Sequence, residues 1–157
     1  MKKIIVLMGM MFIAMSNTFA QKGIKAVGAH ISYGSEVNNM GLGAKFQYNL
    51  TDNIRLEPSM NYFFENETDL FDINANAHYL FPIENNIRIY PLAGLTFGRW
   101  CLSYYLPKVE VTRLVINLGG GAEMDITDNL MINAELKYQY VNDLDQAVFN
   151  IGVAYMF

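Results

Sequence analysis

The residues best suited to chemistry by type and spacing are His30 and Ser32, in the stretch His30-Ile31-Ser32. Residues two apart in a β-strand point to the same face, so the His30 imidazole could act as a base toward the Ser32 hydroxyl. Such a pair also needs a third group that orients the base. The sequence assigns no carboxylate to that task. We therefore predict no catalytic residues and interpret His30 as a buried histidine bonded to its neighbours.

Metal chemistry is the second possibility, because His30, His78 and Asp72 carry suitable donor atoms. Their spacing follows no ligand motif, and two histidines are few for a dedicated site. The acidic stretch at residues 65–69 offers carboxylates for calcium, but a solvated loop accounts for it as well. We therefore expect no metal site and no cofactor.

The elements that must position these residues have a period of two. Apolar and polar residues alternate from residue 22 onward, most clearly in residues 130–140. The alternation predicts eight strands of roughly 10 to 12 residues, which suits tilted membrane-spanning strands. Their approximate ranges are 27–33, 42–49, 55–64, 71–81, 87–97, 114–125, 130–140 and 149–157, with connections at 35–39, 65–69, about 104–111, and 142–146.

A phrase that occurs three times predicts the tight turns between these strands. In residues 50–56, 83–89 and 126–132, three polar residues that end in Asn lie between two apolar residues. Three-residue hairpin loops usually end in a left-handed residue, and Asn tolerates that conformation well. We therefore predict that Asn53, Asn86 and Asn129 are the third residues of three turns. An even number of strands then places both termini on the side of these turns.

Two prolines interrupt the pattern, because proline cannot donate to a strand ladder. Pro58 and Pro91 each follow a turn phrase at the same offset. The repeated offset predicts a β-bulge in both hairpins.

The positions of the aromatic residues indicate which face of the barrel is inside. A soluble, lipocalin-like barrel that binds an apolar ligand would turn its apolar face inward. Here the aromatic residues gather at the two ends of the strands, with aliphatic residues between them, as in the two interfacial girdles of a membrane barrel. More than a dozen rings would also overfill an eight-stranded barrel. The loop-end residues are Tyr33, Tyr62, Phe64, Phe71, Phe97, Tyr138, Tyr140 and Phe149, and the turn-end residues are Tyr48, Tyr79, Phe81, Tyr155 and Phe157.

The polar face must then line the lumen, and it carries charges of both signs. Unpaired charges inside a barrel are costly, whereas dispersed opposite charges can pair. We predict a structural interior network made of Lys45, Arg55, Glu57, Asp72, Arg88, Glu123, Asp125, Glu135 and Lys137. The fold class is all-β, an eight-stranded antiparallel up-and-down transmembrane β-barrel.

Residues 1–20 read as a cleaved signal peptide, and residues 21–157 as the barrel domain. Lys2 and Lys3 precede an apolar run at 4–15, and Thr18-Phe19-Ala20 fits a cleavage site. A membrane anchor is the alternative, but the apolar run is short for a span. Cleavage changes the net charge from −4 to −6, which argues against nucleic acid as a partner. Cys101 is the single cysteine, so no disulfide within the chain is expected.

With its strands placed, the chain resembles the small outer-membrane β-barrel family of Gram-negative bacteria, which includes the OmpA transmembrane domain, OmpX and opacity-type porin-like proteins. The resemblance covers residues 21–157 and rests on the strand count, the turn phrases, the segment Tyr90-Pro91-Leu92-Ala93-Gly94 and the terminal Phe157. It implies a location in the bacterial outer membrane. It also implies that Val153, Tyr155 and Phe157 form a C-terminal signal for the barrel-assembly machinery.

The expected function is a monomeric, non-enzymatic outer-membrane protein with a structural or envelope-integrity role and at most a narrow pore. Its expected partners are outer-membrane lipid and lipopolysaccharide, whose phosphate Arg99 could contact. One alternative is a surface-binding module that acts through the outer loops. Another is a lipid A-modifying enzyme, since His30-Ile31-Ser32 resembles the His–Ser pair of outer-membrane lipid A deacylases.

Overall fold

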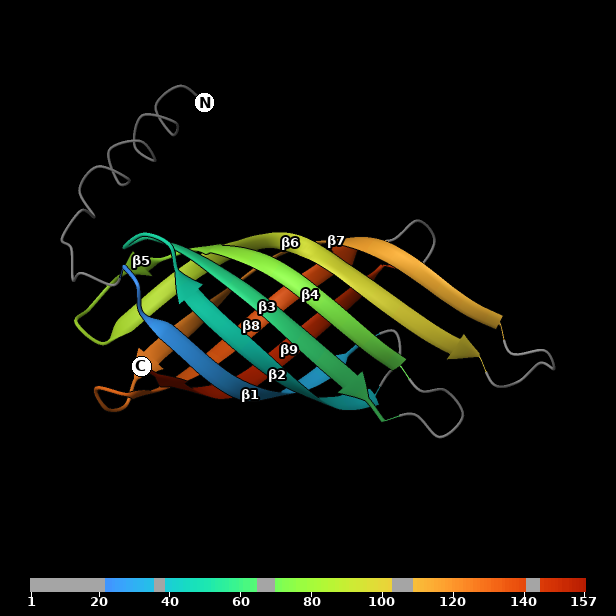
Figure 1. Cartoon of the computed structure of the whole chain (residues 1–157), viewed down its shortest axis with the longest axis horizontal. Helices are drawn as coiled ribbons and strands as arrows, with labels where there is room; N and C mark the ends of the chain where they lie inside the picture. Colours follow the sequence, from blue (N-terminus) through green and yellow to red (C-terminus); the bar gives the residue numbers. More distant parts are fainter. Residues whose placement is uncertain (1–21, 36–38, 65–69, 103–108, 141–144) are drawn as a thin grey trace, which may run out of the picture.

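The computed structural model describes residues 22–35, 39–64, 70–102, 109–140 and 145–157. The predicted signal peptide and the acidic stretch at 65–69 lie outside these ranges. No helix in the described part is long and apolar enough to cross a membrane. The strands are β1 (Lys25–Gly34), β2 (Asn39–Asn49), β3 (Ile54–Phe63), β4 (Leu70–Tyr79), β5 (Phe81–Pro82), β6 (Ile87–Leu102), β7 (Val109–Asp125), β8 (Leu130–Tyr140) and β9 (Gln146–Met156) (Figure 1).

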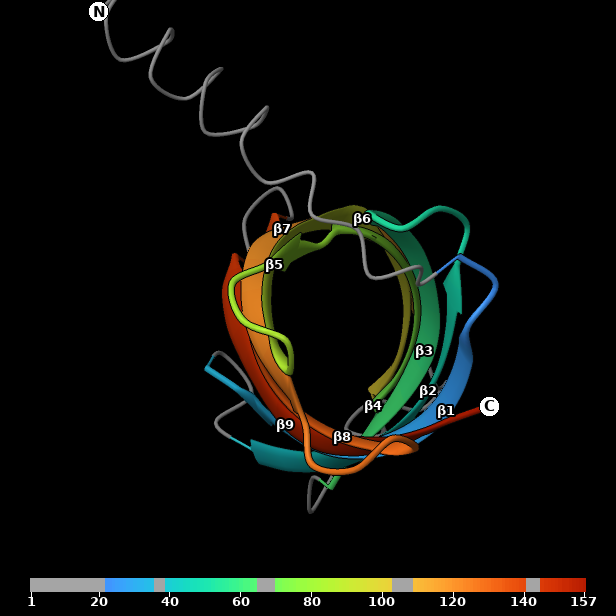
Figure 2. The same ribbon diagram turned by 90° about the vertical axis from the view of Figure 1, so that its left-hand side faces the viewer.

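The strands pair antiparallel around a closed ring, as the view along the barrel shows (Figure 2). Closure comes from two pairings, β1 with β9 and β4 with β6. The two-residue β5 continues the line of β4 and pairs with the start of β6. The predicted eight-stranded barrel is therefore confirmed. Both chain ends of the described barrel lie at the turn side, where Lys25 and Phe157 exchange backbone hydrogen bonds.

The two faces of the barrel wall differ in polarity as the alternation predicts. Outward residues such as Ile31, Leu118 and Ile151 are 51 to 58% exposed, while most of the buried, inward positions are polar. Most of the predicted girdle residues are exposed on the outer surface, and Phe71 and Phe81 are half-buried there. An apolar outside and a polar inside rule out the soluble barrel with an inward apolar face.

The three turn asparagines bond each turn to the turn-side end of a neighbouring strand. The backbone oxygens of Asn53, Asn86 and Asn129 accept hydrogen bonds from the N–H groups of Leu80, Asp125 and Met156, at 2.7 to 2.8 Å. In the second and third turns the bonds from Ile83 to Ile87 and from Ile126 to Leu130 close three-residue loops, as predicted. The predicted strand 71–81 is interrupted at Leu80, between the last β4–β6 pair and the first β5–β6 pair.

The predicted bulges at Pro58 and Pro91 are wrong. The pairing of β2 with β3 keeps one register on both sides of Pro58, from Lys45–Ser59 to Tyr48–Leu56. The pairing of Pro91 with Gly120 likewise fits an unbroken β6–β7 register. Near each proline, two ladder pairs are missing on one side only. The missing proline N–H is thus accommodated by a local gap in one ladder, with no inserted residue.

Two strands are longer than predicted. β6 and β7 have 16 and 17 residues, and their register continues to the pair Leu102–Val109. The predicted connection at about 104–111 is therefore too long. The described pairing of β7 with β8 ends at Ile116, so, within the described residues, 109–115 of β7 pair with β6 alone. The paired β6–β7 hairpin extends past the neighbouring strands at the end opposite the tight turns (Figure 1).

Candidate functional site: the barrel interior

All nine residues of the predicted interior network face the lumen. Eight are at most 4% exposed. The ninth, Asp125, lies at the turn-end mouth, where its side chain is 22% exposed. Their strands place them at three levels along the barrel: near the turns, in the middle, and toward the loops.

The turn-end level is a chain of ion pairs centred on Glu123. The Arg55 guanidinium donates to both Glu123 oxygens, at 2.5 and 2.9 Å. Arg88 Nε donates to Glu123 Oε1 at 2.5 Å, and Arg88 Nη1 donates to Asp125 Oδ2 at 2.8 Å. Each buried charge is thus paired and hydrogen-bonded, which is the condition for tolerating it away from water. A cavity of about 200 Å³ opens beside this level, lined in part by Gln47 and Asn49.

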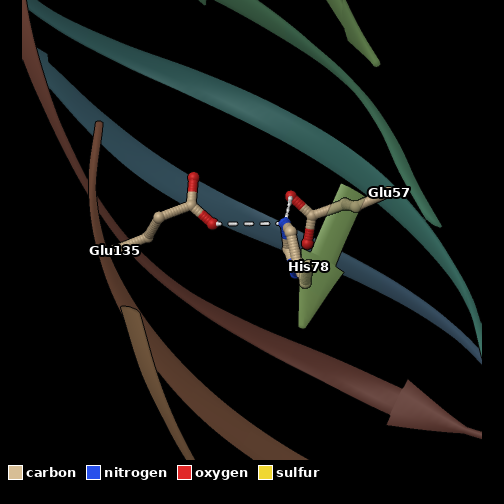
Figure 3. Close-up of side chains that lie close together, drawn as sticks. All are labelled: Glu57, His78 and Glu135. Atoms are coloured by element: carbon tan, nitrogen blue, oxygen red, sulfur yellow. Dashed lines mark ion pairs between the residues drawn. The ribbon is translucent and has the colours of Figure 1, made fainter. Parts of the chain in front are cut away.

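The middle level brings together Lys45, Glu57, His78 and Glu135. The Lys45 ammonium lies 3.6 Å from Glu57 Oε2 and donates to Asn133 Oδ1 at 2.8 Å. The Nε2 atom of His78 lies 3.9 Å from Glu57 Oε1 and 4.0 Å from Glu135 Oε2 (Figure 3). The His78 ring stacks on Tyr90, with ring centres 4.5 Å apart.

The loop-side level is a network of amides around Lys137 and Asp72. Lys137 Nζ donates to Asn74 Oδ1 at 3.0 Å. One oxygen of Asp72 accepts from the side-chain amides of Asn61 and Asn74, each at 2.7 Å. Thr96, Asn117 and Gln139 extend the network across the lumen. Neutral amides therefore bond the two charged side chains at this level.

The structure places His30 and Ser32 inside the barrel, where they are 5% and 0% exposed. Both approach one atom, Asn61 Oδ1, at 2.5 Å from His30 Nε2 and 3.4 Å from Ser32 Oγ. Asn61 rather than a carboxylate is thus the group beside His30. The pair therefore faces away from the lipid-contacting surface, as the interpretation of a bonded interior histidine requires.

The metal trio considered from the sequence does not assemble. His30 and Asp72 share Asn61, whereas His78 lies with Glu57 and Glu135. Sequence reasoning missed this grouping. A β3–β4 hairpin register places Glu57 diagonally beside His78, because Arg55 pairs with His78 and Glu57 pairs with Asn76. Glu135 comes from β8, and only closure of the barrel brings it near.

Comparison with known proteins agrees with this architecture. The family model described as the outer membrane protein beta-barrel domain matches residues 8–157.

The chain belongs to the outer membrane protein beta-barrel family.

It is thus an integral barrel of the bacterial outer membrane. Three crystal structures share this fold. The N-terminal barrel of Pseudomonas aeruginosa OprF has 21% identity and a TM-score of 0.71, with 87% of this chain and 98% of that chain covered. Ail of Yersinia pestis has 20% identity and a TM-score of 0.66, with 87% and 100% covered. Neisserial surface protein A has 19% identity and a TM-score of 0.65, with 89% and 100% covered. No curated protein sequence matches.

The three residues predicted to form an assembly signal face the outside of this outer-membrane barrel. Val153, Tyr155 and Phe157 all lie on the lipid-facing side of the last strand and its end, 42 to 63% exposed. The side chains of Arg99 and Cys101 lie outside the described part of the chain.

Proposed function

We propose that this protein is a non-enzymatic structural element of the outer membrane whose lumen is closed by its own side chains. The observation that carries the proposal is the position of Glu123, which binds Arg55 from β3 and Arg88 from β6. In the ring of strands, β3 and β7 are separated by β4 and β6. The Arg55–Glu123 pair therefore spans the lumen rather than joining neighbouring strands.

Further contacts span the lumen at the other two levels. Lys45 of β2 reaches Asn133 of β8, and Lys137 of β8 reaches Asn74 of β4. In each case two strands lie between the partners. An eight-stranded barrel is just wide enough for side chains to fill. Three levels of crossing contacts leave room for at most a narrow pore. The protein therefore contributes to envelope integrity as a filled barrel embedded in the lipid.

The ion flux of liposomes that contain the purified protein tests this proposal. Wild type should be nearly impermeable to small ions. The double variant Arg55→Ser/Arg88→Ser removes the turn-end crossing and should conduct. The matched control is Lys22→Ser/Lys25→Ser, which removes the same charge from two exposed positions and should stay closed. Equal flux through wild type and the arginine variant would contradict the proposal.

A second candidate is a surface-binding role, favoured by the long β6–β7 hairpin. Among the residues that the structure describes, 109–115 of β7 have a paired neighbour on the β6 side alone. One structural neighbour, Ail, is named an attachment invasion locus protein. Shortening this hairpin by residues 100–111 should abolish binding to host cells while the barrel still folds. Unchanged binding, or no binding by the intact protein, would dismiss this candidate.

A further inference from the structure

We propose that Glu57, His78 and Glu135 form a binding site for one divalent transition-metal ion, of the zinc class, in the middle of the lumen. Figure 3 shows the two glutamates on either side of the imidazole. The three side chains come from β3, β4 and β8. An ion held there would join strands that are not all neighbours. The inference does not depend on whether the lumen conducts.

The spacing of the donor atoms fits ligands of one ion better than direct partners. His78 Nε2 lies 3.9 Å from Glu57 Oε1 and 4.0 Å from Glu135 Oε2, and both distances are too long for a hydrogen bond. The three donor atoms lie within 4.8 Å of one another. Two ligands in tetrahedral geometry on one zinc, each about 2.0–2.2 Å from the metal, lie about 3.3–3.6 Å apart. To close the site, His78 and each carboxylate must approach by some tenths of an ångström, and the two carboxylates must approach each other by up to about 1 Å.

The imidazole of His78 is available to bind such an ion. The residue is 2% exposed, and neither ring nitrogen has a hydrogen-bond partner. A buried polar group without a partner costs free energy. Stacking on Tyr90, at an interplanar angle of 8°, holds the ring with Nε2 between the two carboxylates. A metal ion bound to Nε2 supplies the missing interaction.

The carboxylates are oriented by surrounding residues, as the ligands of metal sites usually are. Glu57 Oε2 accepts from Gln47 at 2.6 Å and lies beside Lys45, which leaves Oε1 to face His78. Glu135 Oε1 accepts from Asn150 at 3.1 Å, which leaves Oε2 toward the imidazole. The Tyr90 hydroxyl also lies 3.3 Å from Glu135 Oε2. That oxygen keeps a second lone pair for an ion.

Charge and donor type select the kind of ion. Among the described residues, His78 is the basic group that lies within 4 Å of Glu135, so this buried carboxylate has no lysine or arginine partner there. Lys45 supplies one positive charge to the two glutamates. A bound divalent cation would supply the further positive charge that balances the second carboxylate. Imidazole nitrogen with carboxylate oxygen suits zinc and its first-row neighbours, whereas calcium and magnesium prefer oxygen ligands alone.

Zinc titration of the purified protein in detergent, followed by calorimetry, tests the site. We expect one zinc ion per chain, and X-ray absorption should show one imidazole and oxygen ligands at about 2.0–2.2 Å. His78→Gln and Glu135→Gln should each weaken binding at least about tenfold. The control is His30→Gln, which changes the other buried luminal histidine and should leave the affinity unchanged.

Two checks make the result decisive. Each variant is run unboiled and boiled on SDS gels, so that a folded barrel is established before its affinity is compared. The same protein is also unfolded in urea and refolded with zinc present, so that slow entry into the lumen cannot hide a site. No bound zinc after refolding, or zinc retained by the folded His78→Gln/Glu135→Gln double variant, would overturn the proposal.

Discussion

Arg55 donates two hydrogen bonds across the lumen to the Glu123 carboxylate, and Glu123 also accepts a hydrogen bond from Arg88. Removal of this one carboxylate leaves two buried guanidinium groups with fewer partners. We expect Glu123→Gln to lower the free energy of unfolding by roughly 3–5 kcal/mol, the usual cost of breaking a buried ion pair. Urea unfolding in lipid vesicles measures the change.

The matched control for this variant is Asp125→Asn. Asp125 also binds Arg88, but its side chain is 22% exposed at the turn-end mouth. Water can therefore replace part of the lost interaction, and the destabilisation should be clearly smaller than for Glu123→Gln. Equal effects of the two variants would show that burial of Glu123 is not what makes its ion pairs important.

The turn asparagines offer a second prediction. Asn53 Nδ2 donates to the Leu80 carbonyl at 3.0 Å, and Asn129 Nδ2 donates to the Met156 carbonyl at 3.0 Å. Asn86 makes the corresponding backbone contact, to Asp125, without a matching side-chain bond in the described structure. Any cost of the turn conformation itself should be common to all three sites.

We therefore expect Asn53→Ala and Asn129→Ala each to cost about 1 kcal/mol more than Asn86→Ala, which is the net contribution of one hydrogen bond. Reversible urea unfolding of the three variants measures the difference. Three equal losses would mean that the side-chain bonds from Asn53 and Asn129 add nothing to stability.

The lipid-facing surface gives a third prediction. Ile151 and Ile83 are 56% and 54% exposed, but Ile151 lies in the middle of β9 while Ile83 lies in a turn. Arginine on the lipid face costs roughly 2–4 kcal/mol at the midplane of the bilayer and about 0–1 near its surface. Ile151→Arg should therefore destabilise the barrel strongly in vesicles, and Ile83→Arg only slightly. Similar effects at both sites would contradict the proposed position of the membrane.

The end of the chain carries a prediction about biogenesis. If Val153, Tyr155 and Phe157 form the assembly signal, Phe157→Ala should reduce the amount of folded protein in the outer membrane. Its stability after refolding in vitro should change little, since Phe157 is 63% exposed. Phe149→Ala is the control, because Phe149 faces lipid on the same strand but lies away from the terminus. Equal membrane levels of the two variants would remove the special role of Phe157.

Much of this fold is predictable from the sequence because its two determinants are local. The alternation of residues fixes which side chains face lipid, and the Asn-ending phrases fix where the tight turns fall. The lengths of β6 and β7 are not predictable in the same way. The stretch from Gly98 to Leu102 pairs with β7 by backbone contacts, and a hairpin of that composition can end earlier without changing the faces of the barrel.

The interior was predicted as a set of residues but not as a set of contacts. Each charged residue of the interior network could be assigned to the lumen from its position in the apolar–polar alternation alone. Which groups meet depends on strand stagger and closure, and these bring Glu135 of β8 to His78 of β4. The prediction of bulges at Pro58 and Pro91 was wrong for a related reason. A missing N–H can be absorbed by an inserted residue or by a gap in one ladder, and the sequence does not distinguish the two.

Conductance of single molecules in a planar lipid bilayer tests most directly whether side chains close the lumen. Purified wild-type protein should insert and give no large, stable open state, with at most brief, small events. Large and stable channels from the wild-type protein would contradict the account, because the contacts around Glu123, Lys45 and Lys137 could not then fill the barrel.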